Sequence, residues 1–192
     1  MLRNTPNGYG LISIVFHWAM VLLILALFGL GLYMTGLPQT ESGTFALYQL
    51  HKSLGFTVLA LVAVRLLWRL ANPVPRLLDV MPGWERAGAH AGHLALYFLI
   101  FAIPLSGWLM VSASPWGIPT VLYGVLHVPH LPVPAALGDK AAAEGTLKGV
   151  HEILAWAVIA LAAFYAAAAF KHHLISRDDT LRRMISTRPA RT

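Results

Sequence analysis

Four long runs of apolar residues alternate with shorter polar segments along the chain. The runs lie near residues 11–36, 47–70, 88–112 and 149–173. An α-helix rises about 1.5 Å per residue, so roughly 20 apolar residues cross the ~30 Å hydrocarbon core of a bilayer. Each run is therefore long enough to span a membrane. The pattern predicts an all-α membrane protein, a four-transmembrane-helix bundle that forms a single domain over residues 1–192.

The segments between the runs carry residues that end helices. Asn72-Pro73-Val74-Pro75 follows the second run, and proline both removes a backbone donor and disfavours helix at the residue before it. The connection over residues 113–148 contains five prolines and is expected to be a loop, and a tail begins near residue 174. The first run is expected to remain as a mature span, because it is too long for a signal peptide and lacks a small-residue cleavage pattern.

Composition supports a membrane protein. Hydrophobic residues make up 57% of the chain and charged residues only 11%, whereas soluble domains carry roughly 25% charged residues. This composition excludes a water-soluble globule. The chain has no cysteine, which also excludes disulfides, cysteine-ligated iron–sulfur clusters and covalently attached c-type haem.

Basic residues divide unequally between the two sides of the predicted spans. The formal net charge is +6, which in so apolar a chain indicates basic flanks of spans rather than nucleic-acid binding. Lys52, Lys140 and Lys148 fall on one side, and the other eleven of the 14 basic residues fall on the opposite side. Basic segments stay in the cytoplasm. Both termini are therefore expected to be cytoplasmic.

This topology sorts the nine histidines into two layers. His51 opens the second span and His151 opens the fourth, so both are expected near the outer face at similar depth. Imidazole inside a span needs a partner, and a haem iron held by two helices needs one imidazole from each. The sequence thus favours a haem between His51 and His151. The alternative is that each bonds a backbone carbonyl or a lipid headgroup.

The inner layer begins with His17, whose partner the sequence leaves open among His90, His93, His172 and His173. Arg65 follows His51 by 14 residues, roughly 21 Å along a helix. A guanidinium at that depth needs a partner such as a haem propionate, unless it snorkels to the interface as expected for Arg69. Gly55, one turn after His51, leaves room for a flat macrocycle.

A set of short motifs resembles one known family. The motifs are SIVFHW at 13–18, HKSLG at 51–55, VRLLWRL at 64–70, AHAGH at 89–93, HE at 151–152, KHH at 171–173 and DDTLRRM at 178–184. Together they extend over nearly the whole chain and resemble bacterial cytochrome b561. The resemblance implies a di-haem b-type cytochrome of the bacterial inner membrane that exchanges electrons with quinone. One branch of the family oxidises superoxide at the outer face and reduces ubiquinone.

The resemblance also implies roles for single residues. His51 and His151 match the ligands of an outer haem, and His17 matches one ligand of an inner haem. The usual partner of His17 is a histidine at the position of Tyr165. The inner haem is then ligated by His17 and Tyr165, ligated by His17 and another histidine, five-coordinate, or absent. His172, followed by His173, matches a position near the quinone, where an imidazole can deliver a proton.

Two functions follow as hypotheses. The first is an oxidoreductase or electron carrier that takes electrons from superoxide or another outer donor and passes them through haem to membrane quinone. The second is a haem-bearing anchor subunit that connects a partner dehydrogenase to quinone, with His127 and His130 in the outer connection as part of a docking surface. A transporter built on layered histidines would need carboxylates in mid-membrane, and the spans have none there.

Overall fold

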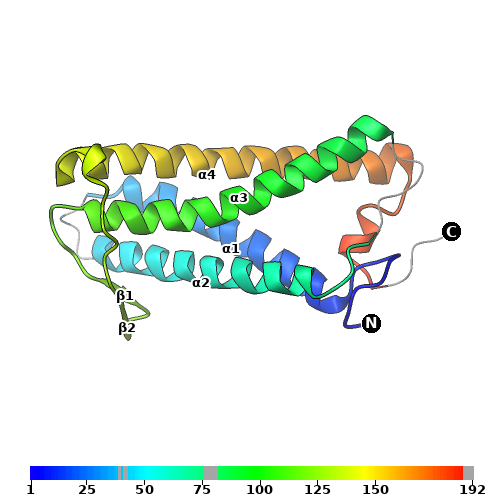
Figure 1. Cartoon of the computed structure of the whole chain (residues 1–192), viewed down its shortest axis with the longest axis horizontal. Helices are drawn as coiled ribbons and strands as arrows, with labels where there is room; N and C mark the ends of the chain where they lie inside the picture. Colours follow the sequence, from blue (N-terminus) through cyan, green and yellow to red (C-terminus); the bar gives the residue numbers. More distant parts are fainter. Residues whose placement is uncertain (39, 41–42, 76–81, 188–192) are drawn as a thin grey trace. The chain divides into compact units, whose positions relative to one another are not determined.

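The computed structural model describes residues 1–38, 40, 43–75 and 82–187. Its main elements are four long helices: α1 (Leu11–Thr35), α2 (Thr44–Leu70), α3 (Gly83–Ala113) and α4 (Lys140–Lys171) (Figure 1). All four are long and apolar enough to cross a membrane. Many of their large apolar side chains are exposed, including Leu22, Leu67, Phe98 and Phe164, as expected for helix surfaces that face lipid. The predicted class is confirmed, and the chain is a multi-pass membrane protein.

The connection between α3 and α4 differs from the loop that the sequence predicts. It contains an antiparallel hairpin, β1 (Thr120–Leu122) and β2 (Leu126–Val128), followed by a short 3-10 helix, η1 (Ala135–Leu137). Helix α4 then begins at Lys140, where a loop as far as residue 148 was expected. Asp139 explains the early start, because its carboxylate accepts a hydrogen bond from the Ala142 N–H at 2.9 Å, as an N-cap residue does.

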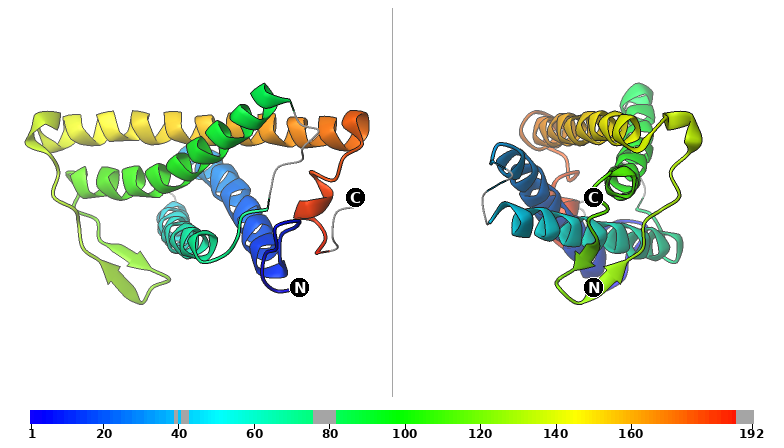
Figure 2. Two further views of the ribbon diagram at one scale, coloured as in Figure 1. Left: turned by 45° about the vertical axis from the view of Figure 1, so that its right-hand side comes forward. Right: turned by 90° about the vertical axis from the view of Figure 1, so that its left-hand side faces the viewer.

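The hairpin is attached to α2 by polar side chains spaced four residues apart on that helix. Gln49 donates to the Pro119 carbonyl at 3.0 Å, Ser53 accepts from the Tyr123 N–H at 3.0 Å, and the hydroxyls of Thr57 and Tyr123 lie 2.6 Å apart. Residues at this spacing share one helix face. Figures 1 and 2 show the hairpin extending from the connection between α3 and α4.

The chain divides into two compact units. The first, here called the His51 unit, consists of Leu23–Ala60 and Leu99–Val158. Its core is built on Ala113, Ala143 and Leu147. The second, here called the termini unit, consists of the described residues of Met1–Leu22 and Leu61–Phe98 and of the chain from Ile159 on. Each unit contains part of every long helix.

The termini unit also holds the segments that precede α1 and follow α4. Asn4 accepts hydrogen bonds from the Gly10 N–H at 2.9 Å and from the Ser13 hydroxyl at 2.7 Å, which folds the N-terminal segment back onto α1. Helix α4 continues into a π-helical turn, η2 (His172–Ser176), and the short η3 (Arg182–Met184) follows. Trp18 of α1 donates its indole N–H to the Met184 carbonyl at 2.7 Å. Three basic residues used to predict the topology lie outside the described residues: Arg76, Arg188 and Arg191.

Removing the N-cap of α4 is expected to destabilise the His51 unit. Asp139→Ala leaves the Ala142 N–H without its acceptor, and loss of such a cap costs about 0.5–2 kcal/mol. Thermal unfolding of the detergent-purified protein measures the effect. Asp139→Asn retains a side-chain oxygen and is the matched control, expected to unfold close to wild type. Equal melting temperatures for Asp139→Ala and wild type would contradict the assignment of this cap.

Candidate functional site

His51 and His151 face each other within the His51 unit. The centroids of their rings, one on α2 and one on α4, are 6.3 Å apart, and the ring planes meet at 77°. Nδ1 of His151 lies 3.0 Å from both the Ser106 hydroxyl and the Ile103 carbonyl. An imidazole that donates to a carbonyl from one nitrogen leaves the other free to bind a metal. Nδ1 of His51 is buried and has no partner within the described part of the chain.

Glycines leave space beside both imidazoles. A methyl group added at Gly31 of α1 would lie 3.4 Å from Cε1 of His51, and one at Gly107 of α3 would lie 3.1 Å from Cε1 of His151. Larger side chains at these two positions would displace the rings. A methyl group added at Gly55 would meet no atom within 4 Å, so open space adjoins α2 one turn after His51.

His17 lies beside Arg65 in the termini unit. Nδ1 of His17 is 3.4 Å from Nη2 of Arg65, and Nη1 of Arg65 is 3.7 Å from Sδ of Met20. Arg65 and Arg69 both approach the Tyr97 ring, at 6.0 and 5.6 Å from its centroid, within cation–π range. Among the described residues, no carboxylate forms an ion pair with either arginine. Within the part of the chain that the structure describes, the two guanidiniums therefore have no carboxylate partner.

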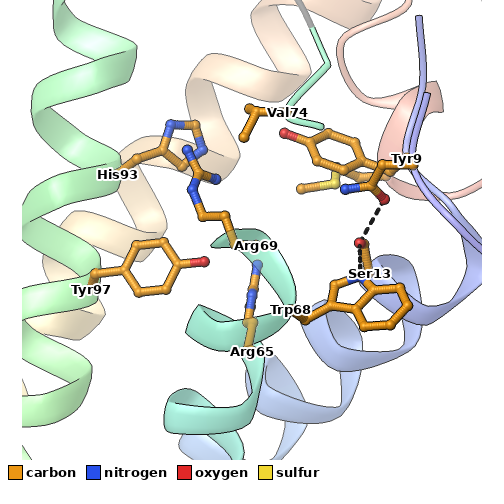
Figure 3. A pocket seen from close by; sticks show the side chains of 10 residues that line it. Tyr9, Ser13, Arg65, Trp68, Arg69, Val74, His93 and Tyr97 are labelled. Atoms are coloured by element: carbon orange, nitrogen blue, oxygen red, sulfur yellow. Dashed lines mark hydrogen bonds between the residues drawn. The ribbon is translucent and has the colours of Figure 1, made fainter. Parts of the chain in front are cut away.

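A pocket opens beside these arginines. It is lined from the N-terminal segment, α1, α2 and α3, and Figure 3 shows Arg69 directed toward His93, with Tyr9 on the opposite wall. Burial raises the pKa of the Tyr9 hydroxyl above its ordinary value, even though Arg69 and Arg65 act in the opposite direction. Tyr9 is therefore neutral at physiological pH. The pocket combines aromatic walls with two cations and suits an anionic group.

Tyr165 contacts α3. Its hydroxyl donates to the Ala89 carbonyl at 2.6 Å, and its ring meets the His93 ring edge-on with centroids 5.3 Å apart. A methyl group added at Gly92 would lie 2.8 Å from the Tyr165 hydroxyl oxygen, so only glycine lets the phenol approach the helix backbone here. Tyr165 therefore uses its hydroxyl to bind α3.

His172 is buried between two carboxylates where α4 passes into the π-helical turn. Its Nε2 lies 3.3 Å from Glu85 of α3, and its Nδ1 lies 2.5 Å from Asp178 of the tail. Lys171 pairs with the same Glu85 at 2.5 Å. Nδ1 of His172 is hydrogen-bonded to Asp178, and a carboxylate therefore lies beside each imidazole nitrogen. His173 is half-buried in the same turn.

Comparison with known proteins identifies the family. Residues 8–187 match the family model for prokaryotic cytochrome b561. The chain belongs to this cytochrome b561 family. It is 39% identical to Cytochrome b561 homolog 2 of Escherichia coli K12 over 182 residues, 95% of this chain and 93% of that protein. It is 28% identical over 179 residues to a Yersinia pestis protein named Probable superoxide oxidase CybB, covering 92% of this chain and 95% of that protein.

Membership of the cytochrome b561 family implies b-type haem, and the His51–His151 pair fits one. A transition metal bonds an imidazole nitrogen at about 2.0 Å, and the ring centre lies ~1.1 Å further, so two axial imidazoles have centroids roughly 6 Å apart. The observed separation is 6.3 Å. Within the described ranges, no three His, Asp or Glu side chains form a site for a free metal ion, whereas axial haem ligation needs at most two side chains.

The sequence does not predict which residues of this cytochrome b561 orient its histidines. Ser106 bonds His151, and Glu85 and Asp178 hold His172. Ser106 carries a usable signal, because a hydroxyl inside a long apolar run needs a partner. Glu85 and Asp178 lie 93 residues apart in the sequence (178 − 85), and only the fold shows that they meet at one imidazole.

The contact between Asp178 and His172 is expected to make stability depend on pH. Burial raises the pKa of the Asp178 carboxyl, but hydrogen bonds from Thr180 and His172 lower it by a larger amount. The pKa is therefore below its ordinary value of 3.8. The stabilisation of the fold by the ionised Asp178 carboxylate is therefore fully present above about pH 4 and is lost as the pH falls through the lowered pKa. Melting temperatures of wild type and Asp178→Asn measured across this range should differ above pH 4 and converge in stronger acid. A difference independent of pH would contradict this role.

Proposed function

We propose that this cytochrome b561 transfers electrons across a bacterial inner membrane from a one-electron donor at the outer face to quinone, with both termini in the cytoplasm. Superoxide is the candidate donor, because one relative is named a probable superoxide oxidase. The observation that carries the proposal is the His51–His151 pair, whose separation suits two axial ligands of one iron.

Four features of the chain support haem binding at this pair. Ser106 and the Ile103 carbonyl orient His151 through Nδ1, and such outer partners fix ring orientation and raise ligand basicity. Gly31 and Gly107 provide space for the two rings. A bound b-type haem supplies one-electron oxidation and reduction.

A second haem is proposed in the termini unit, with His17 as one ligand. Arg65, which lies 3.4 Å from His17 and has no carboxylate partner among the described residues, would pair with a propionate. Pairing also offsets the cost of an arginine inside a membrane span.

Quinone is proposed to react near His172 and His173. Quinol formation takes up protons together with electrons, so the site needs a proton donor. His172 supports this role, because its Nδ1 is hydrogen-bonded to Asp178 and its Nε2 lies 3.3 Å from Glu85, so that a carboxylate lies beside each nitrogen. A histidine placed in this way can release a proton and regain one through either carboxylate.

An alternative function is that of a haem-bearing anchor for a partner dehydrogenase. The hairpin connection favours it, since Trp116 and Val125 are 81% and 83% exposed, and His127 and His130 are exposed as well. These exposed residues lie on the connection outside the four long helices, where a partner protein could contact them. Superoxide-driven quinone reduction by the isolated protein separates the two functions, because an anchor subunit would show none.

Removing His151 is expected to abolish one haem. His151→Ala removes an axial ligand, so haem bound per chain should fall by about half, with the other haem signal retained in the reduced-minus-oxidised spectrum. His127→Ala, an exposed histidine of the hairpin, is the matched control and should leave the spectrum unchanged. An unaltered spectrum for His151→Ala would refute the ligand assignment.

Removing the proton donor is expected to slow quinone reduction without loss of haem. In His172→Gln the rate should fall by roughly 100-fold at neutral pH, the scale of general acid catalysis. Haem content and chemical reduction by dithionite should stay at wild-type levels. His130→Gln is the matched control. A normal quinone rate in His172→Gln would remove His172 from the proposed mechanism.

A further inference from the structure

We propose that His93 of α3 is the second axial ligand of the haem at His17, and that Tyr165 supports His93 from outside the coordination sphere. The inference rests on the proposed function, because it assumes a haem in the termini unit. It concerns Tyr165, the residue at the position where the resemblance to the family implies a ligand histidine.

Tyr165 is unsuited to ligation because its hydroxyl is already engaged. It donates to the Ala89 carbonyl at 2.6 Å, and a phenol that donates its proton is not the phenolate that would bind ferric iron. The ring lies against the α3 backbone at Gly92. A swing toward an iron would give up both the hydrogen bond and this packing.

Three of the four candidate histidines are also unfavourable ligands. His172 has a carboxylate at each nitrogen, Glu85 at 3.3 Å and Asp178 at 2.5 Å, so ligation would break one of these contacts. His90 is exposed. His173 lies beyond the end of α4, in the π-helical turn.

His93 has the properties that the other candidates lack. It is half-buried, it lines the pocket that contains Arg65 and Arg69 (Figure 3), and it interacts electrostatically with His17. Its imidazole also interacts with the Ala89 carbonyl one turn earlier. A carbonyl that holds one ring nitrogen leaves the second nitrogen available for iron.

The contacts around His93 explain what Tyr165 does. Tyr165 and His93 share the Ala89 carbonyl, and the Tyr165 ring meets the His93 ring edge-on at 5.3 Å. Both contacts restrict the rotation of the imidazole. Tyr165 is therefore a positioning residue, which fixes a ligand on the neighbouring helix where a histidine at position 165 would itself ligate.

The two arginines complete the site. Arg65 and Arg69 are four residues apart on α2 and reach the same pocket as His93, and no described carboxylate pairs with either. A haem carries two propionates. The pocket thus offers a cation for each, beside the proposed ligand.

Variants of the full-length protein, purified in detergent, test the inference through haem stoichiometry and low-temperature EPR of the oxidised haems. His93→Ala and His17→Ala should each reduce haem from about two per chain to about one, or convert one low-spin signal to high-spin. Tyr165→Phe should keep both haems with low-spin, bis-imidazole signals. His90→Ala, one turn before His93, is the matched control and should resemble wild type.

Each other outcome has a defined meaning. Loss of a haem in His17→Ala but not in His93→Ala would overturn the assignment of His93 as a ligand. Loss of one low-spin EPR signal in Tyr165→Phe would overturn it as well. If wild type holds only one haem, lost in His151→Ala and retained in His17→Ala, the inference fails while the His51–His151 haem stands. If wild type holds none, the proposed function fails first. If His93→Ala loses both haems through misfolding, His93→Met tests the inference instead. A thioether ligand should keep the haem and raise its reduction potential. An unchanged potential would overturn the inference.

Discussion

Every polar group on the four long helices needs a partner, because hydrocarbon offers none. This requirement accounts for most of the specific contacts in the molecule. Serine and threonine hydroxyls on α2 form hydrogen bonds with backbone and side-chain groups of the hairpin, and the Ser106 hydroxyl forms one with His151. The groups that lack such partners are therefore informative. Among the described residues, Nδ1 of His51 has no hydrogen-bond partner, and the guanidiniums of Arg65 and Arg69 have no carboxylate partner. These are groups to which the proposed function assigns haem binding.

The sequence predicts the helices well because their signal is local. About 20 consecutive apolar residues define a span whatever the rest of the chain does, and α1 and α2 lie close to their expected ranges. The sequence pattern places the start of the fourth helix too late, because residues 140–148 are too polar to be counted in a membrane span. Asp139, whose side chain caps the helix, is a local sequence signal for a helix that begins at residue 140. The pattern does not predict the hairpin, because its strands have three residues each, too few to show a periodic alternation.

The candidate site is only partly readable from the sequence, because its contacts join residues far apart. Equal depth on two spans places His51 and His151 together, and their ring centroids are 6.3 Å apart. Their role as haem ligands stays a prediction. Depth alone could not choose a partner for His17, since several histidines share that layer. The choice depends on which imidazoles are already held by other groups, as His172 is by Glu85 and Asp178. Only the packed side chains show this.

The hydrogen bond between Trp18 and Met184 joins positions 166 residues apart in the chain. A ribosome makes proteins from the N-terminus, so α1 enters the membrane long before its partner carbonyl exists. During that interval the indole N–H must bond to water or to a lipid headgroup. The contact therefore forms among the last in biogenesis, after the fourth helix has been inserted and the tail has been released.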